Sequence, residues 1–178
     1  MALLFYYYFY HRTNRIYMNQ AIQSIIQHLQ EVLEGNPWYG KSVFAILEEI
    51  HPAIAYQKPG NNDNAHSLIE LLYHMITWSE FTLKRLEKDQ NMDLHHFEQM
   101  DWRAIDPAIH TWENGMKAFW LTNNGIIEIL ETKDDSLLNE QVDFREYNFN
   151  VLLNGLIEHH IYHLGQITYI KKLIEGSW

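Results

Sequence analysis

The chain has 178 residues, 47% of them hydrophobic, which fits one folded domain with a sizeable core and excludes a disordered chain. Its 23 acidic residues exceed its 13 basic residues, and the formal net charge of −10 argues against a nucleic-acid partner, because phosphate binding requires many cationic contacts. The absence of cysteine excludes disulfides, thiolate nucleophiles and cysteine-bound metals, so any metal would have to be bound by the 11 histidines or by carboxylates.

Residues 1–17 are an aromatic N-terminal extension that we expect to lie outside the fold, which then comprises residues 18–178 as a single domain. Residues 1–10 are apolar or aromatic, but no cation precedes them as in a secretory signal, and a membrane-spanning helix needs roughly 20 apolar residues. Alternatively, this run is a tag that binds a membrane surface or a partner. No other segment approaches membrane length, so the sequence predicts a cytoplasmic protein without a membrane span.

Periodic apolar residues predict helices in the first part of the chain. Apolar residues recur every three or four positions from Met18 until Gly35 and Pro37 interrupt the pattern, which predicts a first helix. A shorter helix is expected over residues 42–50, and turn-forming residues predict a loop over residues 57–64.

A capping-box pattern marks the start of a long helix in the middle of the chain. Ser67 and Glu70 have the spacing at which the serine accepts from a free helix amide while the glutamate reaches back to the cap. This helix should span about residues 67–87. Residues 88–105 show little periodicity and are expected to be a connection with one or two short turns.

Two further long helices complete the predicted fold. Asp106 followed by Pro107 predicts a helix start, because an acidic N-cap and a proline at the first helical position favour one, and the helix should end near residue 131. The last helix should span about residues 149–175. The sequence therefore predicts an all-α fold, a four-helix bundle with short additional helices.

His159 and His163 are four residues apart on the last predicted helix, so both imidazoles can point at one ion. The spacing alone decides nothing, since a chain this rich in histidine produces such a pair by chance about as often as not. Position adds more, because Leu156 and Ile167 share the same helix face and place both rings toward the interior.

His74 is the candidate third partner, because it falls on the same stripe of its helix as Leu71 and Trp78. Together with His159 and His163 it could form a three-nitrogen site with an open position, as catalytic zinc sites do. The alternative for His74 alone is a core histidine that bonds a neighbouring group.

Other candidates carry less weight. His160 is expected to face a groove or solvent. Glu70 and Glu158 could each orient an imidazole, although Glu70 fits better as the capping-box acid, and no general base or other catalytic residue is identified. The chain has no His-Glu-x-x-His motif and no phosphate-binding Gly-x-x-x-x-Gly-Lys loop, which disfavours the reaction classes that use them.

Three segments resemble the DinB-like superfamily, which contains the DNA-damage-inducible DinB proteins and YfiT-type metal-dependent hydrolases. They are residues 36–42, 65–78 and 153–167, of which the Tyr-His-x-Gly-Gln-Ile run starting at Tyr162 is the most specific. The similarity covers about residues 18–175 and leaves out the aromatic N-terminus.

This resemblance implies a DinB/YfiT-type four-helix bundle, often a homodimer, that holds zinc or nickel on His74, His159 and His163. His160 departs from the family, whose members often carry Asp or Asn at this position. Some members are thiol-dependent transferases or isomerases, so the resemblance implies a small-molecule substrate, including a low-molecular-weight thiol.

Three hypotheses for function follow. The first is a divalent-metal-dependent enzyme, a hydrolase or a thiol-dependent transferase. The second is a non-catalytic metal-binding module that binds a ligand or partner in a stress response. The third is a plain helical scaffold whose histidines bond each other in the core.

Overall fold

The computed structural model describes residues 19–176, so the predicted extension of residues 1–17 lies outside the described range. Within that range the fold is all-α, as predicted, with no β-strand. Its α-helices are α2 (Gln20–Glu34), α3 (Val43–Leu47), α4 (Leu68–Leu86), α5 (Leu94–Met100), α6 (Trp112–Glu131) and α7 (Phe149–Glu175). Short 3-10 turns cover Pro52–Ile54, Pro59–Asn61 and Asp135–Asn139.

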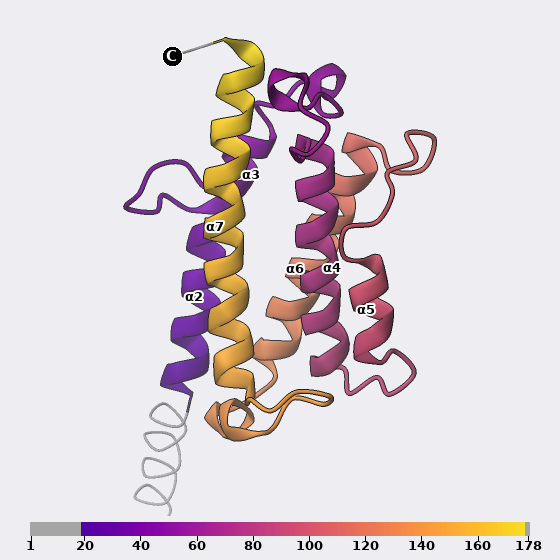
Figure 1. Ribbon diagram of the computed structural model, residues 1–178. Helices are drawn as coiled ribbons and strands as arrows, with labels where there is room; N and C mark the ends of the chain where they lie inside the picture. The colour runs from indigo at the N-terminus through magenta and orange to yellow at the C-terminus, as the bar shows by residue number, and fades with distance from the viewer. Residues whose placement is uncertain (1–18, 177–178) are drawn as a thin grey trace, which may run out of the picture.

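The four long helices α2, α4, α6 and α7 enclose the core. α4 packs against both α6 and α7, and α2 also packs against both, so each long helix has two long neighbours. The colours of Figure 1 show that α4 and α6 run in one direction while α2 and α7 run in the other. α5 packs on the outside of α4.

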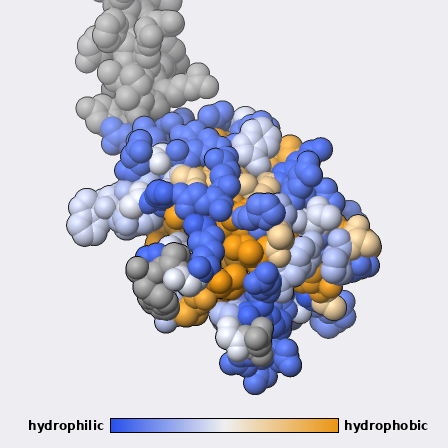
Figure 2. Space-filling model, turned by 90° about the horizontal axis from the view of Figure 1, so that it is seen from above, coloured by the Kyte–Doolittle hydropathy of each residue, from blue (hydrophilic) through white to orange (hydrophobic). Residues whose placement is uncertain are grey.

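Hydrophobic side chains fill the space between these helices, and the core includes the almost fully buried Leu29, Leu72, Phe119, Ile126 and Leu153. In the end-on view of Figure 2, hydrophobic surface shows between mainly hydrophilic residues. No helix within residues 19–176 combines the length and the apolar character that crossing a membrane requires.

The predicted capping box at the start of α4 is confirmed. The backbone N–H of Ser67 donates to the Glu70 carboxylate at 2.7 Å, and the N–H of Glu70 donates back to the serine hydroxyl at 3.4 Å. These contacts satisfy amides that a helix start leaves free, and they fix the residue at which α4 begins. His74 lies one turn beyond Glu70 and faces the interior.

The predicted start of α6 is wrong. The helix begins at Trp112, where the Thr111 hydroxyl accepts from the N–H of Asn114 at 3.1 Å. The Asp106 carboxylate instead accepts from the N–H of Ala108 at 2.9 Å, which closes a local turn. Aspartate side chains compete with helices in this way, so the acidic cap and the proline mark a turn. The preceding connection also contains α5, a helix where only short turns were predicted.

Gly115 allows α6 to approach α4 closely. A Cβ atom at this position would lie 2.8 Å from Cδ2 of Leu72 and 3.0 Å from Cε2 of Tyr73, and both side chains are buried. Gly165 on α7 is the contrasting case, since a Cβ there would meet nothing within 4 Å.

Replacing Gly115 by alanine should therefore stabilise the protein less than replacing Gly165, even though both changes favour a helix by about 1 kcal/mol. The difference in the free energy of unfolding between Gly115→Ala and Gly165→Ala should be about 1–3 kcal/mol, the usual cost of overpacking a core. Urea unfolding of both variants measures it, and equal stabilities would contradict a tight α4–α6 contact.

Candidate metal centre

His74, His159 and His163 meet between α4 and α7, as the sequence predicts, and we call them the histidine cluster. Nε2 of His74 lies 2.9 Å from Nε2 of His159 and 3.0 Å from Nε2 of His163. Three ligand nitrogens of the cluster lie within 4.8 Å of one another. A tetrahedral zinc ion with Zn–N bonds of 2.0–2.1 Å holds its nitrogens about 3.3 Å apart, so these side chains could bind a metal ion with small movements.

The surroundings of the cluster are largely buried and aromatic. His74 and His163 are buried, and His159 is half-buried. The indole of Trp102 stacks on the imidazole of His74 with ring centroids 4.0 Å apart, and His66 stacks on the same indole at 3.8 Å. Because Trp102 is 45% exposed, it lies between the cluster and solvent on this side.

The Asp101 carboxylate lies against the outer nitrogen of His74 and favours one tautomer of the ring. Its Oδ1 lies 2.5 Å from Nδ1 of His74, a close contact that is poorly aligned for a hydrogen bond, and it also accepts from Nε1 of Trp78 at 2.9 Å. A carboxylate oxygen attracts a proton to the nitrogen that faces it, so this contact assigns the proton of the neutral His74 ring to Nδ1. Its Nε2 then presents a lone pair to the cluster.

Gln166 has the corresponding effect on His163. Its amide oxygen, in the assigned orientation, lies 2.7 Å from Nδ1 of His163 and accepts the proton of that nitrogen. Nε2 of His163 therefore also carries a lone pair. Two lone pairs 3.0 Å apart cannot form a hydrogen bond with each other, whereas a cation between the nitrogens would satisfy both.

Without a metal, His159 cannot supply a hydrogen bond to both of the Nε2 lone pairs of His74 and His163. A proton on its Nε2 could be donated to His74, but the lone pair of His163 would still lack a partner within the cluster. In addition, Nδ1 of His159 is buried without a hydrogen-bond partner among the described residues. Unpaired buried polar groups are costly, so this geometry counts against histidines that merely bond each other.

Electrostatics keep the cluster neutral, which is the form that binds metals. Burial lowers the pKa of His74 to about 3, and the neighbouring His163 adds to the effect. The same two causes lower the pKa of His159 to about 3. Burial also lowers the pKa of His163, although Gln166 and the charge of Asp101 oppose the shift. The imidazoles are therefore uncharged at neutral pH, each with one ring proton.

The expectation for His160 is wrong. Its side chain is fully buried, and its Nε2 lies 3.0 Å from the amide oxygen of Asn123 on α6. The ring also meets Phe119 edge-on, with centroids 5.0 Å apart. The prediction failed because the His160 ring reaches across the core to side chains of α6, between the faces that α7 packs against α4 and α2, so the buried surface of α7 is wider than one stripe.

The carboxylate beside the cluster was also missed. Glu70 is engaged in the capping box, and Glu158 is exposed, whereas Asp101 makes the contact with His74. Asp101 follows α5 in a connection without periodicity, so no sequence pattern could place it. Gln166 lies three residues after His163 on the same helix, a spacing that could have suggested a contact.

Comparisons with protein-family models, curated proteins and solved structures give no match for this chain. The resemblance to the DinB-like superfamily thus stays a prediction from the three sequence segments. The geometry of the histidine cluster does not depend on it.

Acidification should destabilise the metal-free protein. In the folded state His74 and His159 have pKa values of about 3, while in the unfolded chain they protonate near 6.5, so the unfolded state binds more protons between these values. The contribution of these two imidazoles to the free energy of unfolding is fully present above pH 6.5. It is lost as the pH falls toward 3, at up to about 1.4 kcal/mol per pH unit for each imidazole.

Urea unfolding in the presence of EDTA at pH 7 and pH 5 measures this loss. The free energy of unfolding should differ less between pH 7 and pH 5 in His159→Gln, by about the contribution of one imidazole. His28→Gln, which changes an exposed side chain, is the control and should leave the difference unchanged. If the free energy of unfolding of His159→Gln depended on pH as strongly as that of the unchanged protein, the loss of stability would not come from the buried His159.

Proposed function

We propose that the chain is a divalent-metal-dependent enzyme, a hydrolase or a thiol-dependent transferase, whose histidine cluster holds zinc or nickel. The observation that carries this proposal is that the Nε2 atoms of His74 and His163 face each other 3.0 Å apart in a buried site, while a carboxylate and an amide oxygen face their outer nitrogens. Three neutral imidazoles with an open position are the ligand set of catalytic rather than closed structural zinc sites.

The protein's own groups prepare this site. Asp101 and Gln166 hold protons on the outer nitrogens of His74 and His163, so both rings direct their lone pairs inward. Trp102 limits the access of water on one side. When bound there, a divalent ion supplies Lewis acidity and lowers the pKa of a bound water or thiol. Because the chain lacks cysteine, any thiol would have to arrive with the substrate.

The proposal retains the finer expectations from the sequence resemblance. The packing of each long helix against two others supports a four-helix bundle of the DinB/YfiT type. The homodimer, the cytoplasmic location and the small-molecule substrate rest on the sequence alone. The non-catalytic metal-binding module is the alternative, and it predicts a fourth protein ligand in place of an open position.

Metal titration of the purified protein tests the proposal. We expect one zinc or nickel ion per chain and a rise in melting temperature on metal addition, since binding to the folded state alone stabilises it. His163→Ala should abolish stoichiometric binding, whereas His28→Ala should bind as the unchanged protein does. Metal content below about 0.2 equivalents with no thermal shift would leave the plain scaffold as the better hypothesis.

Removing the carboxylate beside His74 should weaken metal binding. Asp101→Ala should reduce the affinity by about 10–100-fold, the usual effect of losing a group that orients a ligating histidine. Asp101→Asn should lose less, because the amide oxygen can still accept the proton of Nδ1. Competition with a chromophoric chelator gives both affinities, and an unchanged affinity of Asp101→Ala would show that this residue does not orient the ring.

A further inference from the structure

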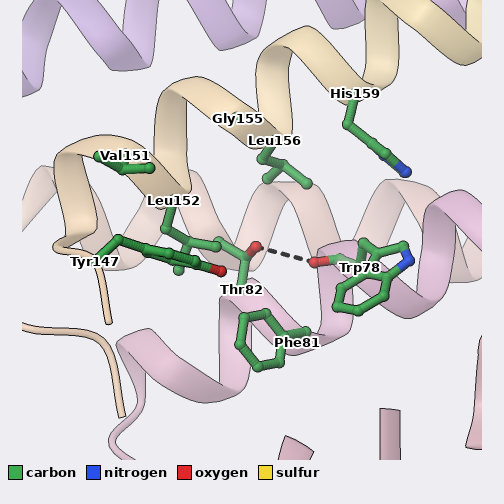
Figure 3. A pocket seen from close by; sticks show the side chains of 9 residues that line it. All are labelled: Trp78, Phe81, Thr82, Tyr147, Val151, Leu152, Gly155, Leu156 and His159. Carbon is green, nitrogen blue, oxygen red and sulfur yellow. Dashed lines mark hydrogen bonds between the residues drawn. The ribbon is translucent and has the colours of Figure 1, made fainter. Parts of the chain in front are cut away.

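An apolar cavity of about 260 Å³ lies between α4 and α7, beside the histidine cluster. Figure 3 shows Trp78 and Phe81 of α4 on one side and Leu152, Gly155 and Leu156 of α7 on the other. His159 lines the same cavity at one end, with its ring directed between the two helices. The cavity and the cluster therefore share a side chain.

The residues that line the cavity are uncharged. None of its residues is an Asp, Glu, Lys or Arg. Its polar groups are few, and the Thr82 hydroxyl already donates to the backbone oxygen of Trp78 at 2.9 Å (Figure 3). The Arg145 guanidinium lies against the rings of Trp78, Phe81 and Tyr147, 5.3–5.9 Å from their centroids, but it is not part of the wall. A charged group placed here would lose its hydration without an ionic partner in the wall itself, which is costly. The chemistry of the wall thus favours an uncharged apolar occupant.

Size and access fit part of a small molecule. A cavity of ~150 Å³ lined by apolar residues is known to bind benzene, so 260 Å³ can accept a larger aryl group or a branched alkyl group. Val151, which also lines the cavity, is 52% exposed, so this wall reaches the surface and offers an entry path.

Trp78 connects the cavity with the cluster. One part of its indole lines the cavity, while its Nε1–H donates to Asp101, the residue in contact with His74. An occupant that packs against the indole is therefore linked to His74 on α4 through Trp78 and Asp101, and it directly meets His159 on α7.

We propose that this cavity binds the uncharged aryl or alkyl arm of the substrate and places the reacting end beside His159. The inference rests on the proposed function and narrows its substrate class to small molecules that join an apolar arm to a polar reacting group. A purely polar substrate would leave the cavity without a role.

Two glycines of α7 provide a matched pair of variants. A Cβ at Gly155 or at Gly165 would meet nothing within 4 Å, so a larger side chain enters open space at either position. Gly155 lines the cavity, whereas Gly165 lines a separate groove with Ile46 and Ile161, which no member of the histidine cluster lines. Both substitutions remove a helical glycine, so their effects on the helix itself are alike.

The test uses the full chain with 5-fluorotryptophan in place of tryptophan, observed by ¹⁹F NMR with and without zinc. The Trp78 resonance is assigned by its loss in Trp78→Phe. Titration with 2-naphthalenemethanol, a neutral two-ring probe, should shift this resonance to saturation. Gly155→Leu should weaken the binding at least tenfold, whereas Gly165→Leu should leave it within twofold. The anionic analogue 2-naphthoate should bind more weakly than the neutral probe.

Three results would overturn the inference while leaving the metal centre intact, provided that zinc still binds stoichiometrically. They are a Trp78 resonance that the probe does not shift, an equal loss of binding in both glycine variants, and tighter binding of 2-naphthoate. A Trp78 shift that depends on protein concentration without probe would identify a second copy of the chain as the occupant and would also overturn it. If the probe bound but zinc did not, the proposed function would be overturned. The inference that the reacting end of the substrate lies beside His159 would then fail as well.

Discussion

The packing of α4 against α7 is the constraint on which the site depends, because it brings His74 to the two histidines of α7. The i, i+4 spacing aligns His159 and His163 on one helix, but it supplies neither the third nitrogen nor the carboxylate contact. Those depend on the helix that faces α7 and on the connection that follows α5, where Asp101 reaches Nδ1 of His74. The site is therefore a property of the tertiary fold.

The residues that sequence reasoning placed correctly are those whose position follows from local periodicity. His74, His159 and His163 lie on amphipathic helices, and a helix face can be read from spacing alone. The start of α4 was equally readable, because a capping box is formed by neighbours in the chain.

The errors concern residues whose position depends on distant partners. His160 was misplaced because its buried state depends on a partner on α6, a helix far away in the sequence, which its ring reaches across the core. Asp101 was missed because it approaches His74 from a connection with no regular pattern. The start of α6 was misjudged because an aspartate can close its own turn as well as cap a helix, and the sequence does not distinguish the two.

The contact between His160 and Asn123 sets the rotation of α7 about its own axis. Neighbouring residues on a helix are turned by about 100° from each other, so His159 and His160 cannot face the same helix at once. Holding His160 on Asn123 of α6 directs His159 and His163 toward α4. A rotation by one position would exchange the anchoring ring and the cluster ring, and the buried amide oxygen of Asn123 would lose its contact with His160. A single polar contact in the core, outside the cluster itself, thus fits only the rotation of α7 that brings the three imidazoles together.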